Sequence, residues 1–121
     1  MTTTIRLVLS SLLLWTVTAT GWAHAFLNHA EPGVGSQVKT SPSQVKIWFT
    51  EKLEPALSHI QVFDAAGKEI DRRDSRLDTT NPAILEVSLP PLKPGKYKVS
   101  WRVTSVDTHV TTGTFEFEIV P

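Results

Sequence analysis

KYKVSWRVT, residues 96–104, decides the fold class, because apolar and polar side chains alternate along its whole length. TGTFEFEIV, residues 112–120, repeats the alternation near the end of the chain, with apolar residues at every second position from Phe115. Successive side chains of a β-strand point to opposite faces of its sheet, so this pattern indicates a strand with one buried and one solvated face. Both stretches are therefore predicted to be amphipathic strands.

Short apolar or alternating runs of the same kind lie upstream, separated by turn residues at intervals of about ten residues. Pro94-Gly95 and Asn81-Pro82 are two of these turns. The rhythm is typical of all-β sandwiches and barrels, and seven strands suit two facing sheets. The predicted strands are residues 26–30, 45–49, 60–64, 68–72, 84–89, 96–104 and 112–120.

Tyr97 follows a Pro-Gly turn directly, at the entrance of a predicted strand. This position resembles the tyrosine corner of immunoglobulin-like sandwiches, in which the hydroxyl group bonds back to nearby backbone. The signal concerns the fold and carries no information about function.

The most polar stretch, residues 71–81, mixes acidic and basic side chains without periodicity. We interpret it as a solvated loop between strands, with a partner-docking loop as the alternative. Neither interpretation gives the stretch a chemical role.

The composition limits the chemistry that the domain can perform. With 12 Lys and Arg against 12 Asp and Glu, no basic surface indicates binding to nucleic acid. Cysteine is absent and the single methionine is Met1, so the rest of the chain has neither a thiolate nor a thioether ligand. A methionine-rich Cu(I) site has no donors in such a chain. The sequence also lacks a glycine-rich phosphate loop and a cysteine nucleophile.

Residues 1–23 follow the pattern of a secretory signal peptide, with one basic residue, an apolar run over residues 7–17 and small residues near position 23. The run is shorter than the roughly 20 residues that span a bilayer, so we expect cleavage after Ala23 rather than a membrane anchor. The chain would then be exported, with no stable membrane insertion after cleavage. Residues 24–121 have the size of one domain with one core.

Cleavage after Ala23 would make His24 the first residue of the domain, with a free α-amine beside its imidazole. Nδ1 and the α-nitrogen could chelate one metal ion, and a second imidazole would complete a T-shaped set of three nitrogens. Cu(II) favours tetragonal nitrogen and oxygen ligation, so this set suits Cu(II). The alternative for His24 alone is a frayed, solvated terminus.

Asp107 and His109 lie in the connection between the two amphipathic strands. Residues two apart on an extended backbone project to the same side, so both side chains could address one ion. The carboxylate could bind the ion or fix the tautomer of the imidazole. The alternative is a turn aspartate that caps backbone amides beside an exposed histidine.

A series of short motifs runs in order along the domain: His24, Glu31-Pro32 with Gly33 and Gly35, Phe49-Thr50-Glu51, Leu92-x-Pro94-Gly95-x-Tyr97, Val99-x-Trp101-Arg102, Ser105-Val106-Asp107-Thr108-His109 and Gly113. Together, in a chain of this length, they resemble the CopC family of periplasmic copper-binding proteins. The resemblance covers nearly the whole domain. It implies a Greek-key β-sandwich or barrel that carries one Cu(II) ion in the periplasm, in copper resistance or copper supply.

The resemblance implies that His24 supplies an amine and an imidazole, His109 a second imidazole, and Asp107 a carboxylate at or near the copper. Glu51 matches the glutamate of the family's Phe-Ser/Thr-Glu motif and is expected behind the direct ligands. Some members hold Cu(I) on a methionine-rich loop with a histidine. Residues 63–81, the corresponding region, contain neither residue type, so we expect Cu(II) alone.

We interpret the protein as a copper carrier or buffer in resistance or homeostasis rather than an enzyme, because so small a domain leaves little surface for a substrate. An inner-membrane copper transporter and a cuproenzyme are the candidate partners. One alternative is a copper oxidase built on the same amine and imidazole, and ascorbate-driven oxidation of a polysaccharide would favour it. The other is a metal-free immunoglobulin-like interaction module, which partner binding unaffected by chelator would favour.

Overall fold

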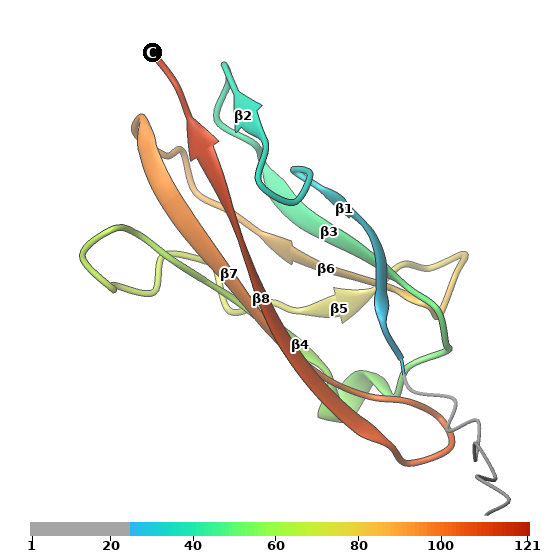
Figure 1. The fold of residues 1–121 in the computed structure, drawn as a ribbon. Coiled ribbons are helices and arrows are strands. Elements are labelled where there is room, and N and C mark those ends of the chain that lie inside the picture. Colours follow the sequence, from blue (N-terminus) through green and yellow to red (C-terminus); the bar gives the residue numbers. More distant parts are fainter. Residues whose placement is uncertain (1–24) are drawn as a thin grey trace, which may run out of the picture.

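The computed structural model describes residues 25–121, which form a sandwich of two four-stranded sheets (Figure 1). The predicted signal peptide, residues 1–23, and the candidate ligand His24 lie outside the described residues. Over residues 25–121, no helix has the length and apolar character needed to cross a membrane. The elements in chain order are β1 (Leu27–Glu31), β2 (Gln37–Val38), β3 (Gln44–Phe49), the 3-10 helix η1 (Pro55–Leu57), β4 (His59–Phe63), β5 (Arg76–Leu77), β6 (Ile84–Ser88), β7 (Gly95–Thr104) and β8 (Val110–Ile119).

The strand order is β1-β3-β6-β5 in one sheet and β2-β8-β7-β4 in the other. The chain changes sheet repeatedly, as between β3 and β4 and again between β6 and β7, so strands distant in sequence become neighbours. Among the described strands, pairing is antiparallel except between β2 and β8. The all-β Greek-key sandwich expected from the sequence is confirmed.

The hairpin of β7 and β8 forms the centre of the second sheet. Its paired residues run from Gly95 opposite Ile119 to Thr104 opposite Val110. Both strands were predicted from their alternation, and β8 begins two residues earlier than expected. The two faces of β7 match the prediction, because the apolar residues of its inner face are buried and the basic residues of its outer face are exposed. The buried residues are Tyr97, Val99, Trp101 and Val103, and the exposed ones are Lys96, Lys98 and Arg102.

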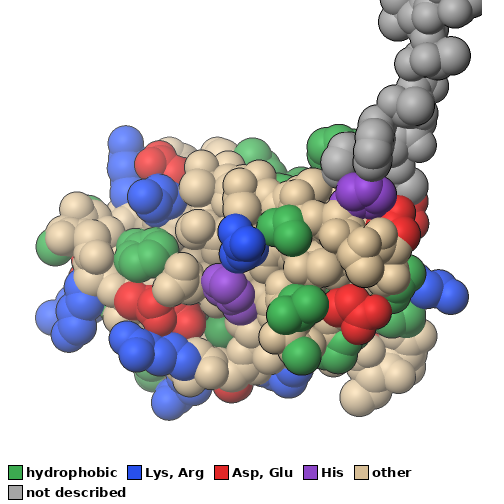
Figure 2. Space-filling view, turned by 90° about the horizontal axis from the view of Figure 1, so that it is seen from below, with side chains coloured by type: hydrophobic (Ala, Val, Ile, Leu, Met, Phe, Trp, Pro, Cys, Tyr) green, Lys and Arg blue, Asp and Glu red, His purple; other side chains and the backbone are tan. Residues whose placement is uncertain are grey.

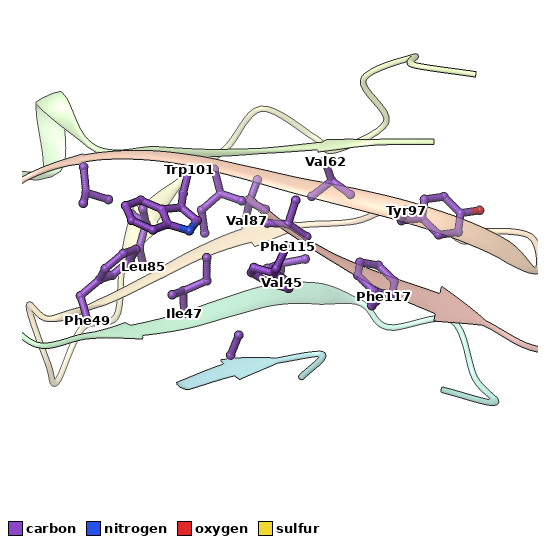
Figure 3. Packing of buried hydrophobic residues seen from close by; sticks show 14 of the residues in the cluster. Val45, Ile47, Phe49, Val62, Leu85, Val87, Tyr97, Trp101, Phe115 and Phe117 are labelled. Atoms are coloured by element: carbon purple, nitrogen blue, oxygen red, sulfur yellow. The ribbon is translucent and has the colours of Figure 1, made fainter. Parts of the chain in front are cut away.

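Side chains from the inner faces of both sheets meet in one apolar core (Figure 3). The rings of Tyr97 and Phe117 stack with their centroids 5.5 Å apart, and Phe49 meets Trp101 edge-on at 5.2 Å. The chain has no cysteine, so burial of this apolar surface stabilises the domain without disulfides. The aliphatic side chains with no exposed surface include Val45, Ile47, Val62, Leu85 and Val87.

Gly113 faces Trp101 across the hairpin and makes room for its indole ring. A Cβ atom at position 113 would lie 2.6 Å from Trp101 Cε2, closer than carbon atoms approach without a clash. A glycine is therefore required here because the ring lies over the backbone of β8.

Tyr97 forms the predicted tyrosine corner. Its hydroxyl group donates to the backbone carbonyl of Lys93 at 2.6 Å, just upstream in the chain. Burial raises the pKa of Tyr97 above its ordinary value, and the negative charge of Asp64 adds to the effect, although the bond to Lys93 opposes it. The corner fixes the turn that feeds β7.

The structure has eight strands where seven were expected, because two short pairings carry no sequence pattern. The two residues of β2 lie beside β8 in parallel. The two residues of β5 fall inside residues 71–81, the stretch interpreted as a solvated loop, and pair with β6. Two residues are too few to show an alternation.

The predicted strand over residues 68–72 is wrong. Glu69 makes an isolated bridge with Phe63, but the pairing does not continue as a ladder. Two residues further on, the buried carboxylate of Asp71 accepts the backbone N–H of Val62 at 2.8 Å. The backbone N–H of Val62, on the edge of β4, is thus satisfied by a side chain where the prediction placed a neighbouring strand.

Candidate metal centre

Residues 105–109 join β7 to β8 as a tight turn at the lower end of the sandwich in Figure 1. The backbone N–H of Ser105 donates to the carbonyl of His109 at 2.9 Å, and that of Thr108 donates to the carbonyl of Ser105 at 2.8 Å. Thr108 has a φ of 73°, a left-handed conformation that threonine seldom adopts. The chain therefore reverses within these five residues and brings the side chains of the turn together.

Asp107 and His109 are in direct contact in this turn, with Asp107 Oδ2 3.2 Å from His109 Nδ1. They meet because the chain reverses at Thr108, not because of the extended alternation considered from the sequence. The carboxylate lies against Nδ1, so it orients the ring and leaves Nε2 as the nitrogen that this pairing favours for a metal. The side chain of Asp107 is 43% exposed and that of His109 is 29% exposed, so an ion could reach both from solvent.

Ser105 is hydrogen-bonded to both Asp107 and His109, a role that sequence reasoning missed. Its side chain has no exposed surface. The hydroxyl group donates to Asp107 Oδ1 and accepts the backbone N–H of His109 at 3.3 Å. The bond from Ser105 lowers the pKa of Asp107 below its ordinary value, and the His109 imidazole contributes further, so the carboxylate is ionised at neutral pH. A serine in a polar turn gives no sequence signal that distinguishes it from a solvated one.

The first described residues of the domain are fixed at the same end by two threonines. Thr111, at the start of β8, donates its hydroxyl to the carbonyl of Ala25 at 2.7 Å. Thr50 accepts the backbone N–H of Phe26 on its hydroxyl at 3.0 Å and donates its own N–H to the Phe26 carbonyl at 2.9 Å. Ala25 is completely buried. The first described residue, Ala25, is therefore held at a fixed point beside the turn.

Glu51 is half-buried and lies between Thr50 and Lys52, each of which is hydrogen-bonded to another segment at this end. On one side, Thr50 is bonded to Phe26. On the other, the carbonyl of Lys52 accepts the backbone N–H of Val106 at 3.0 Å. Glu51 thus belongs to the segment that links the start of the domain to the turn.

The two other histidines lie on the strands β1 and β4. His29 is exposed on β1, where its Nε2 is 3.6 Å from Glu31 and its ring contacts Trp48 at 4.7 Å. His59 is exposed at the start of β4. Within residues 25–121, no three His, Cys, Asp or Glu side chains gather closely enough to hold a metal ion. Figure 2, which views the molecule from below, shows histidine and acidic side chains among many uncharged ones.

The donors that the described residues supply are one imidazole and one carboxylate. Nitrogen and oxygen donors of this kind suit Cu(II), whereas Cu(I) prefers sulfur ligands. Within residues 25–121, the pair is not joined by a third His, Cys, Asp or Glu side chain that would complete a metal site.

The fold and the site define a class of protein: a small β-sandwich that carries an aspartate–histidine pair in the turn at one end. The chain belongs to the CopC domain family, whose model matches residues 27–120.

The relatives of this chain include copper transport and copper resistance proteins. The copper transport protein CutJ of Bacillus subtilis (strain 168) is 32% identical over 101 residues, which cover 83% of this chain and 19% of CutJ. The chain thus spans about a fifth of that relative's length. The crystal structure of CopC from Methylosinus trichosporium OB3b has a TM-score of 0.76 and 36% identity, covering 81% of this chain and 95% of CopC. PcoC, a methionine-rich copper resistance protein from Escherichia coli, has a TM-score of 0.69 and 25% identity, covering 81% and 100%.

Proposed function

We propose that the protein is an exported Cu(II) carrier or buffer that acts in the periplasm, in copper resistance or homeostasis. The observation that carries the proposal is the placement of Ala25, which Thr111 holds beside the turn containing Asp107 and His109. A histidine freed immediately before Ala25 would have its α-amine and imidazole within reach of that turn. One Cu(II) ion would then bind per chain.

Each proposed ligand has a separate role in this site. His24 supplies the α-amine and one imidazole, and His109 supplies the second imidazole. Asp107 acts at or near the ion and holds the ring of His109 by its contact with Nδ1. Glu51 contributes from behind these groups, on the segment that is bonded both to Phe26 and to the turn.

The sequence supports Cu(II) rather than Cu(I) as the bound state. The chain contains no cysteine, and its one methionine lies in the segment that we propose is removed. PcoC, by contrast, is described as methionine-rich. A chain without sulfur ligands has nothing with which to favour Cu(I).

A site that uses an α-amine should lose copper as the pH falls. The unperturbed amine has a pKa of about 7.7 to 8.0, so at neutral pH copper must displace a proton from it. Protons compete more strongly at lower pH, and the affinity should decline steeply below neutrality.

The proposed role is carriage, with delivery to an inner-membrane copper transporter or to a cuproenzyme. The match to CutJ supports the transporter, because a domain similar to this chain is part of one polypeptide with the remainder of a copper transport protein. A separate chain would make the corresponding contact transiently. Carriage requires only reversible binding of the ion, and the two donors lie in a turn that solvent can reach.

The decisive experiment compares Cu(II) titration and electron paramagnetic resonance spectra for two proteins, one beginning at His24 and one with a single extra residue before it. The extension leaves every described side chain unchanged and removes only the free amine of His24. We expect a one-to-one, nitrogen-rich tetragonal signal in the first protein and weaker binding in the second, by roughly tenfold or more. Equal binding by both would show that the amine is not a ligand and would overturn the site.

A further inference from the structure

Large hydrophobic side chains are exposed mainly at the end of the sandwich that carries Asp107 and His109. Over residues 25–121, five large hydrophobic residues are markedly exposed, and four of them lie at this end. We call these four the apolar rim. They are Phe26 at 56% exposure, Leu57 at 58%, Val106 at 51% and Val110 at 47%.

Two residues of the apolar rim flank the metal donors in the chain. Val106 immediately precedes Asp107, and Val110 immediately follows His109. A partner that is seated on this turn would therefore contact the two valines and lie beside the two donors. Figure 2 shows hydrophobic side chains interspersed with the histidines on the underside of the molecule.

Leu57 and Val110 both line one open groove on the outer face of the second sheet. The groove runs between η1 and the start of β8, and Thr104 holds its floor by donating its hydroxyl to the Leu57 carbonyl at 3.3 Å. Its lining combines these apolar residues with polar and charged ones at the margin. Besides Leu57 and Val110, it contains Glu54, Ala56, His59, Arg102, Thr104 and Thr108.

The size of the apolar rim indicates a transient contact rather than a permanent interface. Four half-exposed side chains of this kind present on the order of a few hundred Å² of apolar surface, the size of patches that are often functional. A stable dimer buries roughly 1,600 Å² in total. A carrier that must load and release its ion needs a contact of the smaller kind.

We propose that the apolar rim is the docking surface for a membrane copper-transport protein, which would seat over the rim and reach the ion held beside it. This inference rests on the proposed function, because it takes the flanked turn as the copper site. Its own support is the continuity of the rim with the two donors and its small area. The rim also places the apolar contact on the one end where docking would shield the ion from water.

The test uses photo-crosslinking of the full chain in its native host, with p-benzoylphenylalanine introduced at position 57. Val34 supplies a matched control, because it is 60% exposed and lies at the other end of the sandwich. The neighbouring Gly35 donates to the carbonyl of Glu116, which is six residues along β8 from Val110, or about 20 Å at about 3.3 Å per residue. We expect a product at position 57 that mass spectrometry identifies as a membrane copper-transport protein, and no such product at position 34.

A crosslink from position 57 to a second copy of this chain, to lipid or to nothing would overturn the proposal. Equal crosslinking from position 34 would also overturn it, since that result would indicate nonspecific contact with the transport protein.

A second measurement separates docking from copper binding. The variant Leu57→Ser/Val110→Thr should retain the wild-type Cu(II) titration, while copper tolerance of the host falls toward that of a deletion strain. The variant Val34→Ser should change neither property. Unchanged tolerance in the double variant would overturn the docking surface, and so would a loss of Cu(II) affinity, because the rim would then be part of the site. Failure of the wild-type chain to bind Cu(II) would instead remove the proposed function.

Discussion

The paired part of the β7–β8 hairpin and the turn that joins its strands are built in opposite ways. In the paired part, Trp101 and Phe117 are buried, and Gly113 leaves no space for another atom over the indole ring. In the turn, Asp107 is exposed and Ser105 beneath it is buried, so hydrogen bonds rather than packing fix the geometry. The strands therefore provide stability, and the turn can be altered chemically without dismantling the fold.

The largest expected effect breaks the paired part. The substitution Gly113→Ala should lower the free energy of unfolding by about 3 kcal/mol, because the new methyl group would overlap the Trp101 ring. Chemical denaturation measures the change. Thr112→Val, on the exposed face of the same strand, should alter stability by less than about 0.5 kcal/mol. Equal effects of the two substitutions would show that the indole can move aside.

The next effect breaks the turn without breaking the strands. His109→Ala should weaken Cu(II) binding by about tenfold or more, because it removes a proposed in-plane ligand. Asp107→Asn should cost less, since the amide can still contact the ring. The apo-protein should keep its unfolding free energy within about 1 kcal/mol in both cases. His59→Ala is the control, because that side chain is exposed on β4; a similar loss there would contradict the assignment.

A substitution at Ser105 should affect both properties and so sharpen the comparison. Ser105→Ala removes a buried hydroxyl that serves Asp107 and the backbone of His109, and should cost about 1 to 1.5 kcal/mol of stability. Copper affinity should fall as well, because the two donors lose their common support. Calorimetric titration beside denaturation would separate the effects. Lost stability with unchanged copper affinity would mean that Ser105 does not position the donors.

The smallest expected effect is at the opposite end, in the tyrosine corner. Tyr97→Phe should cost about 1 kcal/mol through the lost bond to Lys93, with no change in copper binding. The raised pKa of Tyr97 also predicts the alkaline behaviour. Its stabilising contribution should be complete below about pH 10 and disappear as the pH rises through the folded-state pKa, because the unfolded state then ionises more readily. A wild-type protein that shows the same alkaline profile as Tyr97→Phe would contradict this.

The long amphipathic strands could be predicted from the sequence because each residue contributes to one repeating pattern. Val99 and Val103 fall on the buried face that the alternation assigns to them. The segment containing Asp71 could not be predicted in this way, because the backbone N–H of Val62 donates to its carboxylate rather than to a carbonyl of a paired strand. Residues whose role depends on one side-chain contact leave no periodic signal.

The candidate site also contains some residues that could be predicted from the sequence and others that could not. Asp107 and His109 could be singled out because their residue types suit a metal and they are close in sequence. Ser105, Thr50 and Thr111 could not, because hydroxyl groups are common in turns and strands, and only the three-dimensional structure identifies their acceptors. The turn itself depends on the left-handed conformation of Thr108, which no local sequence rule anticipates.

The complete burial of Ala25 constrains the order of maturation. Proteases act on segments that are exposed and can extend into the enzyme, whereas Ala25 is covered by the sandwich and its carbonyl is held by Thr111. If the chain is cut after Ala23, as we propose, a protease that also has to bind Ala25 in an extended form would have to act before the sandwich closes. A chain that folded first would then resist this cut and would lack the terminal amine that the proposed copper site requires.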